Sequence, residues 1–198
     1  MVKIKICGLM DQVTVEAVCA FGVDYLGFVF AKSKREVQPE FVAQITKNVP
    51  QTIKKVGVFV SPTLEQVNDI VQRAHLDVVQ IHGELTFERC GVPMIQAKSG
   101  DAQLNSSTIA DYLLLDAPPQ EYYGGNGTTF AWEQVNPAQL PREHLFIAGG
   151  LTAQNVSQAI AYFQPYAVDV SSSVETEGKK DLAKIQQFIA SVKENNYV

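Results

Sequence analysis

The chain has 198 residues, of which 46% are hydrophobic and 19% are charged, and its formal net charge is −5 at pH 7. This length and composition are typical of one globular domain, residues 1–198, that buries roughly 70% of its unfolded surface. The acidic balance, with no basic cluster beyond residues 32–35, argues against nucleic acid as a partner, and no apolar run is long enough to span a membrane.

The first predicted strand covers residues 2–6, where apolar residues alternate with two lysines. This period of two is typical of a strand with one buried face. Cys7 follows directly and precedes Gly8, where the chain can change direction and a side chain can point into a cleft. Two interpretations of Cys7 remain open at this stage: a reacting thiol, or a small buried core residue, as free cysteine usually is.

The three cysteines, at positions 7, 19 and 90, are odd in number and lack the C-x-x-C spacing of a metal site. These features predict reduced thiols in a cytoplasmic protein without a bound metal. The lysines near the N-terminus also interrupt the apolar core that a secretory signal peptide needs.

Seven further strands are predicted, each ending in polar or glycine-rich sequence. They cover residues 25–30, 56–60, 78–81, 94–97, 112–115, 145–148 and 167–170. Several are continuously apolar, as expected for parallel strands that are covered by helices on one side and filled by side chains on the other. A strand followed by a helix, repeated eight times, indicates an α/β fold of the (β/α)8 TIM-barrel type. The competing architecture, a doubly wound open sheet, seldom has eight strands in so short a chain.

Capping residues mark the predicted helix ends. Asp11 is predicted to begin the first helix, and Gly22 to end it in the left-handed conformation. Ser61, which precedes a proline, is predicted to cap the helix after the third strand. Thr152 and Asp181 are predicted to begin the helices that follow the seventh and eighth strands.

The fourth crossover is predicted to be shortened. Only residues 83–93 lie between the fourth and fifth strands. A chain of this length is near the lower size limit of a barrel, so some crossovers must be trimmed. We therefore expect a short or irregular helix at this position.

Polar residues lie at the ends of several predicted strands, and barrels form their active sites at that end. In chain order these residues are Cys7, Arg35, His82, Asp116, Gly149, Gly150, Asp169, Ser171 and Ser172. A thiol, a guanidinium, an imidazole and a carboxylate are therefore expected around one mouth of the barrel.

The glycines after the seventh strand predict a phosphate site. Gly149 and Gly150 let the backbone approach an anion, and a helix starting at Thr152 would direct its positive end to the same place. Residues 171–173 add amides and hydroxyls, and these two loops commonly bind phosphate in barrels. The alternative is that the glycines only form tight turns. Residues 124–127 are either a mobile lid or a plain flexible loop.

Segments along the whole chain closely resemble the phosphoribosylanthranilate isomerase family. They are KICGL around Cys7, GFVFAKSKR (27–35), VGVFV (56–60), VVQIHGE (78–84), LLLDA (113–117), YGGNGTTFAW (123–132), AGGLTAQNV (148–156) and AVDVSSSVETEGKKD (167–181). The resemblance implies conversion of N-(5′-phosphoribosyl)anthranilate to 1-(o-carboxyphenylamino)-1-deoxyribulose 5-phosphate, the third step of tryptophan biosynthesis from chorismate. It also implies that no metal and no organic cofactor is needed, and that the chain is a monomer or a homodimer.

The resemblance also implies roles for individual residues. The reaction, an Amadori rearrangement, needs a proton on the ring oxygen and removal of the C2 proton from the resulting imine. Asp116 is implied as the general acid, for which we expect a raised pKa, and Cys7 as the general base, for which we expect a lowered pKa. Arg35 is implied to hold the anthranilate carboxylate with its bidentate fork.

The resemblance also implies supporting roles for the other residues that match the family. His82 is expected to assist binding, and Asp169 either to bond the sugar hydroxyls or to orient the loop. The residues implied to bind the rest of the substrate are Gly127, Gly149, Gly150, Ser171 and Ser172.

Two positions depart from the family pattern. Ser173 stands where the family usually has glycine, and Ala131 where it often has aspartate. Serine takes the left-handed conformation only at some cost, so we expect a slightly reshaped phosphate loop.

Two other functions stay open as alternatives. One is a different phosphosugar enzyme with a barrel fold. The related isomerase of histidine biosynthesis relies on paired aspartates, and indole glycerol phosphate synthase needs glutamates in addition to a lysine such as Lys98. The other is a catalytically silent phosphate-binding barrel, against which the Cys7 and Asp116 pair argues.

Overall fold

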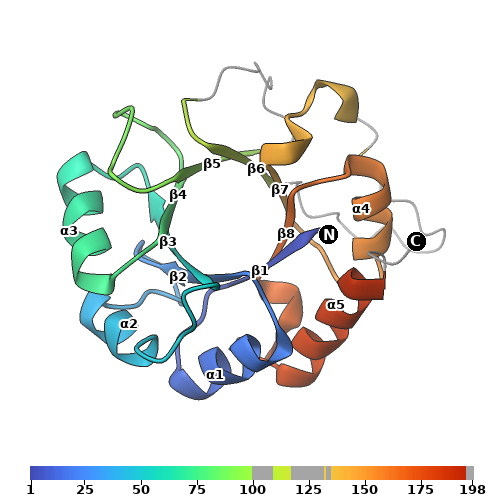
Figure 1. Ribbon diagram of the computed structural model, residues 1–198, viewed down its shortest axis with the longest axis horizontal. Helices are drawn as coiled ribbons and strands as arrows, with labels where there is room; N and C mark the ends of the chain where they lie inside the picture. Colours follow the sequence, from blue (N-terminus) through green and yellow to red (C-terminus); the bar gives the residue numbers. More distant parts are fainter. Residues whose placement is uncertain (100–108, 117–131, 133–134, 195–198) are drawn as a thin grey trace.

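The computed structural model describes residues 1–99, 109–116, 132 and 135–194, and its centre is a closed barrel of eight strands with helices around the outside (Figure 1). All eight strands are parallel, and they follow one another around the barrel in chain order until β8 pairs with β1. The predicted TIM barrel is therefore confirmed.

Each barrel strand lies within two residues of its predicted bounds. The strands are β1 Lys3–Cys7, β2 Tyr25–Val29, β3 Lys54–Val60, β4 Val78–His82, β5 Met94–Ser99, β6 Tyr112–Asp116, β7 Leu145–Ala148 and β8 Ala167–Val170. The helices are α1 Gln12–Phe21, α2 Pro39–Ile45, α3 Leu64–Ala74, α4 Val156–Phe163 and α5 Leu182–Glu194. Short elements are the 3-10 helices η2 Pro137–Gln139, η3 Arg142–His144 and η4 Ser172–Val174, and the hairpin of β9 Glu175–Thr176 and β10 Lys179–Lys180.

The described helices follow β1, β2, β3, β7 and β8. Residues 83–93, between β4 and β5, contain no helix, so the expectation of even a short helix there is wrong, although the crossover is as short as predicted. Eleven residues that must return along the whole barrel leave little chain for a helical turn. No helix in the described residues is long and apolar enough to cross a membrane.

Three predicted helix ends are confirmed. Asp11 caps α1 by accepting a hydrogen bond from the backbone of Thr14, and Gly22 ends this helix in the left-handed conformation at φ 80°. Asp181 accepts hydrogen bonds from the backbone of Ala183 and Lys184 at the start of α5. These short polar side chains satisfy backbone groups that a helix end leaves unpaired.

Two predicted helix starts are wrong. The cap of α3 is Thr63, which forms a capping box with Gln66, while Ser61 takes a left-handed φ of 44° and accepts a hydrogen bond from the backbone of Glu84. Thr152 precedes a turn rather than a helix. Its backbone N–H donates a hydrogen bond to the Asn155 side chain, and α4 begins only at Val156.

The barrel interior is filled at the amino ends of the strands. There Tyr25, Tyr112, Phe146 and Tyr166 pack with ring centroids 5.3–5.7 Å apart. A second, larger apolar layer lies between the strands and the helices. Because side chains alternate along each strand, a strand such as β6 contributes Leu113 and Leu115 to the outer layer and Leu114 to the interior. Polar side chains such as Asp116 lie at the opposite, carboxyl end of the interior.

Candidate active site

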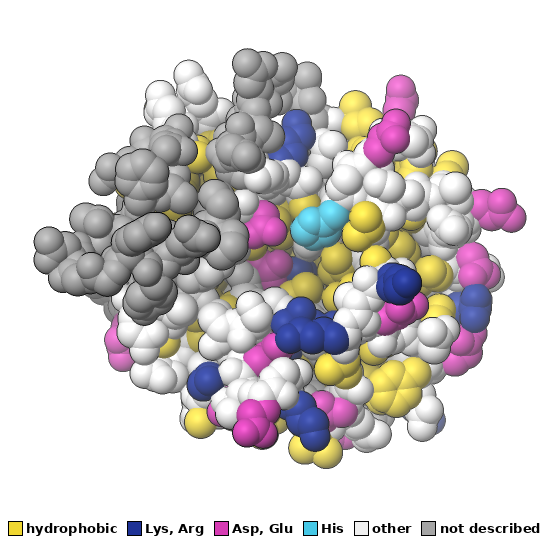
Figure 2. Space-filling model, turned by 180° about the vertical axis from the view of Figure 1, so that it is seen from behind, with side chains coloured by type: hydrophobic (Ala, Val, Ile, Leu, Met, Phe, Trp, Pro, Cys, Tyr) yellow, Lys and Arg dark blue, Asp and Glu magenta, His cyan; other side chains and the backbone are white. Residues whose placement is uncertain are grey.

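A pocket of about 440 Å³ opens at the carboxyl ends of the strands. Figure 2 looks onto this end, where acidic, basic and imidazole side chains surround a central hollow. Nine of the residues predicted for the site line the pocket: Cys7, Arg35, His82, Asp116, Gly149, Gly150, Asp169, Ser171 and Ser172. The tenth, Gly127, lies outside the described residues, as do residues 124–127 as a whole and Ala131.

Cys7 is the last residue of β1 and only 8% exposed. Gly27 lies opposite it on β2, and a Cβ atom there would come within 2.8 Å of the Cys7 Sγ, so this glycine makes room for the thiol. Burial raises the pKa of Cys7, and the Lys5 ammonium opposes this effect only in part. The expectation of a lowered pKa is therefore wrong.

Asp116 ends β6 and faces the same pocket. Burial raises the pKa of this carboxyl group, and the nearby His82 and Lys5 lower it by less. This is the direction that was predicted for a general acid, since a raised pKa keeps the proton available for transfer.

His82 ends β4, and its Nε2 lies 2.8 Å from the side-chain amide of Gln80, two residues earlier on the same strand. Burial, followed by the charge of Lys5, lowers the pKa of His82. The imidazole is therefore neutral at pH 7 and can exchange hydrogen bonds with a ligand.

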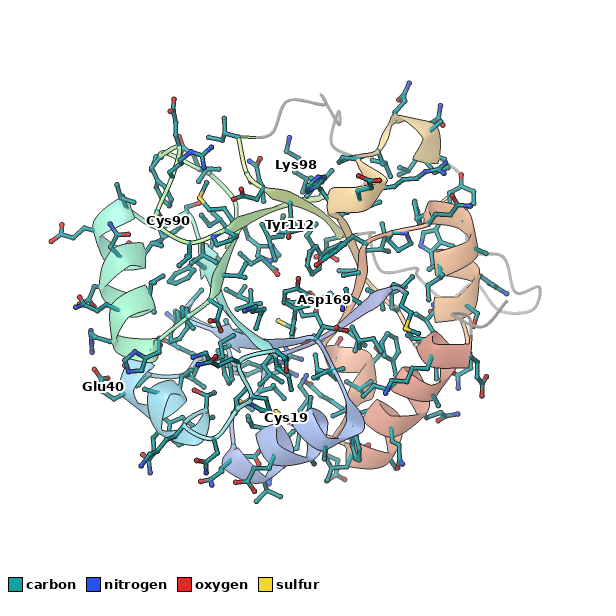
Figure 3. All side chains as sticks on the ribbon, viewed as in Figure 1. Cys19, Glu40, Cys90, Lys98, Tyr112 and Asp169 are labelled. Carbon is teal, nitrogen blue, oxygen red and sulfur yellow. The ribbon has the colours of Figure 1, made fainter. Side chains whose placement is uncertain are left out.

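Asp169, on β8, forms an ion pair in the barrel interior with Lys5 on β1. The Lys5 Nζ lies 2.7 Å from Asp169 Oδ2, and the two side chains are 0% and 7% exposed. Figure 3 shows Asp169 inside the ring of strands. Its second oxygen, Oδ1, is buried without a hydrogen-bond partner and belongs to a residue that lines the pocket.

Arg35 forms a second ion pair at the rim. Its Nε and Nη2 each donate to the Glu175 carboxylate at 2.7 Å, and Lys180 donates to the same carboxylate at 2.9 Å. Burial alone would raise the pKa of Glu175, but the hydrogen bonds from Arg35 and Lys180 lower it to about 2. Gly8, at φ +80°, brings the backbone so close to Arg35 that a side chain there would overlap the Arg35 Cδ.

The pairing with Glu175 leaves part of the Arg35 fork available. A guanidinium has five N–H donors, and Glu175 takes one from Nε and one from Nη2. The end formed by Nη1 and the second Nη2 hydrogen can therefore still meet another planar carboxylate through two parallel hydrogen bonds.

The loops after β7 and β8 meet as predicted for a phosphate site. Gly149 and Gly150 both have left-handed φ, at 81° and 65°. The Ser173 hydroxyl donates to the Leu151 carbonyl and so links the two loops. Ser173 is not in the left-handed conformation, so serine at this position does not strain the backbone. Because α4 begins only at Val156, however, its end does not directly follow the two glycines.

Four charged or polar groups near the site were not predicted from the sequence: Lys5, Gln80, Glu175 and Lys180. Alternation along the strands could have indicated Lys5 and Gln80. They lie two residues before Cys7 and His82, and side chains two residues apart on a strand point to the same face. The other two lie on the hairpin after β8, which sequence patterns did not indicate. Among the described residues, no three His, Cys, Asp or Glu side chains could together hold a metal ion.

The family model, the sequence relatives and several solved structures point to the same family. The model of the family described as N-(5'phosphoribosyl)anthranilate (PRA) isomerase matches residues 4–191. The N-(5'-phosphoribosyl)anthranilate isomerase of Streptococcus mutans is 50% identical over 199 residues, covering 98% of this chain and 100% of the relative.

Solved structures agree. The phosphoribosyl anthranilate isomerase of Thermotoga maritima is 36% identical with a TM-score of 0.84, and the match covers 98% of this chain and 100% of that one. A structure in complex with reduced 1-(o-carboxyphenylamino)-1-deoxyribulose 5-phosphate is 33% identical, with a TM-score of 0.82 and the same coverage. A third, of monomers generated from the dimeric Thermotoga maritima enzyme, is 32% identical with a TM-score of 0.79 and covers 98% of this chain and 99% of that one.

The family model spans nearly the whole chain, and the relatives match it from end to end. The barrel, the pocket at its carboxyl end and these matches agree with one another. The chain belongs to the N-(5′-phosphoribosyl)anthranilate isomerase family and is an isomerase of tryptophan biosynthesis.

Proposed function

We propose that Asp116 and Cys7 are the general acid and the general base with which this isomerase rearranges N-(5′-phosphoribosyl)anthranilate. The observation that carries the proposal is the position of the two groups, since they end strands β6 and β1 and line one pocket. Asp116 gives its proton to the ring oxygen as the bond from that oxygen to C1 breaks and the nitrogen lone pair forms the imine. Cys7, as thiolate, then removes the C2 proton; the electron pair left on C2 forms the C1=C2 double bond of the enolamine, while the C=N π pair returns to nitrogen. The enol then becomes the ketone of the product as C1 takes up a proton and the hydroxyl on C2 loses one.

The raised pKa of Asp116 supports the first of these steps, because the group must carry a proton when the substrate arrives. The neutral imidazole of His82 lies at the same mouth and serves as a hydrogen-bonding group for the substrate. Asp169 Oδ1, which is buried without a partner, supports a hydrogen bond from a sugar hydroxyl rather than a role in orienting the loop.

The two ends of the substrate bind on different sides of the pocket. The free end of the Arg35 fork receives the anthranilate carboxylate, while Glu175 holds the other end of the fork in place. Phosphate binds at the backbone of Gly149 and Gly150 and at the hydroxyls and amides of Ser171 and Ser172, with Gly127 as a further contact by resemblance.

The dimeric relative from Thermotoga maritima supports a homodimer as the assembly of this chain. A phosphorylated substrate is supported by the relative that was solved with the reduced product analogue. The cytoplasmic location stays a prediction, in keeping with amino-acid biosynthesis.

The fluorescence of freshly made phosphoribosylanthranilate, followed as it is lost in the presence of the purified protein, tests this proposal. Replacing Cys7 by serine leaves a group of similar size that is a far poorer base, so we expect turnover to fall about 10²–10⁴-fold. The matched control is Cys19→Ser on α1, outside the ring of strands in Figure 3, for which we expect unchanged turnover. Near-normal turnover by folded Cys7→Ser would show that the thiol is structural.

A further inference from the structure

Lys5 is a fully buried lysine whose charge has no role in the proposal above. It lies in the middle of β1, and its side chain is 0% exposed. A buried ammonium is costly unless it is paired, and a buried ion pair is weak evidence of a contribution to stability. The position of Lys5 relative to Cys7 suggests what this charge does.

Lys5 and Cys7 are two residues apart on the same strand, so both side chains leave β1 on the side of the barrel interior. Register fixes the partner of Lys5 as well, because Lys5 pairs with Asp169 across the β1–β8 ladder. The ammonium donates one of its three hydrogens to Asp169 at 2.7 Å, which anchors it in the barrel interior. Burial raises the pKa of Cys7, and the charge of Lys5 is the largest effect that lowers it.

We propose that Lys5 is a positioning residue of this isomerase: its ammonium, anchored by Asp169, supplies the positive charge that stabilises the Cys7 thiolate. This inference deepens the role of Cys7 proposed above and rests on it for its catalytic meaning. The effect of Lys5 on the Cys7 thiolate can be measured without any turnover.

The other charged groups near Cys7 come from several elements. Lys180 on β10 and Arg35 after β2 both attract a thiolate, but Glu175 on β9 pairs with each of them. Asp169 on β8 acts in the opposite direction and disfavours the thiolate.

Two further titratable groups face the pocket, from β4 and β6. His82 has a lowered pKa and is neutral at pH 7, so it supplies no positive charge. Asp116 has a raised pKa and supplies no positive charge in either form. Lys5 therefore differs from these groups: it is a cation that lies on the same strand as Cys7 and is fully buried in the barrel interior.

The test is the pH dependence of Cys7 alkylation by iodoacetamide, which reacts with the thiolate. Peptide mapping by mass spectrometry separates Cys7 from Cys19 and Cys90. In Lys5→Met the rate at neutral pH should fall at least about tenfold, the scale expected when one neighbouring charge is lost. In Asp169→Asn the rate should rise, because the opposing negative charge is gone while the asparagine amide oxygen can still accept the hydrogen bond that anchors Lys5.

Opposite changes in these two variants distinguish a charge effect from a structural one, because loosened packing would move both rates in the same direction. The matched control is Lys3→Met: Lys3 lies on the same strand and pairs with Asp24 at 2.7 Å, but its side chain is 44% exposed. We expect its alkylation profile to equal that of the wild type. The proposal would be overturned if Cys7 alkylation depended on pH in the same way in Lys5→Met and in the wild type. It would also be overturned if the alkylation rate changed in the same direction in Lys5→Met and Asp169→Asn.

A double variant keeps the test decisive if Lys5→Met alone does not fold. Lys5→Met/Asp169→Asn leaves no unpaired buried charge, and neutral replacement of a buried pair is often tolerated. It differs from Asp169→Asn only in Lys5, so its Cys7 should react at least about tenfold more slowly. Equal rates in these two proteins would overturn the proposal.

Turnover measured beside alkylation separates the two ideas. If Cys7→Ser keeps its activity, Cys7 is not the base and the proposed function fails, whereas the alkylation rates still decide what Lys5 does to the thiol. If both ideas hold, the acidic limb of the kcat/KM profile moves to higher pH in Lys5→Met and to lower pH in Asp169→Asn.

Discussion

The two ends of the barrel interior differ in composition although the same eight strands build both. At the amino ends, Tyr25, Phe146 and Tyr166 pack ring against ring, and the hydroxyls of Tyr25 and Tyr166 lie 2.9 Å apart. At the carboxyl ends, the interior holds the thiol of Cys7 and the carboxyl group of Asp116 around an open pocket.

Strand β6 shows how this division arises within five residues. Tyr112 belongs to the aromatic end, Leu114 to the middle of the interior and Asp116 to the pocket, each two residues from the last. The amino end excludes water by packing large rings, whereas the carboxyl end keeps titratable groups where a ligand can reach them. Substitutions at the two ends should therefore separate stability from activity.

The largest effect is expected for Asp116→Asn at the carboxyl end. Asparagine keeps the shape but cannot give a proton to the ring oxygen, so turnover should fall about 10²–10⁴-fold with little change in product affinity. The control is Asp111→Asn, just before the other end of β6, where the side chain accepts a hydrogen bond from the backbone of Met94. Comparable losses in both variants would contradict a difference between the two ends.

The same variant, Asp116→Asn, should lose turnover but gain stability relative to the wild type as the pH rises. The folded protein holds the Asp116 proton more tightly than the unfolded chain does, because the pKa is raised above its usual value of 3.8. The wild type therefore loses stability as the pH rises from 3.8 through the raised pKa, and the variant lacks this loss. Urea denaturation over this pH range measures the difference, and an identical pH dependence in the two proteins would contradict it.

Phe146→Ala tests the amino end. Phe146 is fully buried among the rings, so we expect the free energy of unfolding to fall by about 3–5 kcal/mol. Turnover per folded molecule should stay near that of the wild type. Denaturant titration measures the first and the fluorescence assay the second, with Val13→Ala on the exposed face of α1 as the control. A selective loss of turnover at unchanged stability would show that this end takes part in the chemistry.

The smallest of these effects is expected for Arg35→Ala, at the rim of the pocket. Loss of a charged hydrogen bond should weaken substrate binding by roughly 1.5–3 kcal/mol. Arg35→Lys should restore only part of this, since an ammonium cannot form the fork. The control is Lys34→Ala, which removes a neighbouring cation whose side chain is 65% exposed.

An analogue without the ring carboxylate sharpens the assignment of Arg35. It should bind the wild type as weakly as the substrate binds Arg35→Ala, and it should lose almost nothing further on that variant. Equal losses on both proteins would mean that Arg35 does not contact the carboxylate.

Local signals predicted most of the fold. Apolar runs such as 145–148 and 167–170 match β7 and β8 without error, and Asp11, Gly22 and Asp181 mark helix ends as expected. One error arose where two local signals competed. Ser61 and Thr63 are both capping residues, and contact of Ser61 with the backbone of Glu84, 23 residues away, decides between them.

The sequence predicted those site residues that lie at the ends of strands. Cys7, His82 and Asp116 end their strands, and parallel strands of a barrel bring such ends together. The charges that act on them were not predictable in this way. Alternation on β1 suggested one buried face, but a closed barrel buries both, and Lys5 is fully enclosed.

The sequence by itself determined the strand order, the end of the barrel that carries the chemistry and the family, because these depend on local patterns and on motifs. Only the tertiary structure decided which charges meet: Lys5 with Asp169 across 164 residues, and Arg35 with Glu175 across 140. It also decided that the pKa of Cys7 is raised rather than lowered. Charge interactions depend on distance and burial, and both are set when the barrel closes and joins β8 to β1.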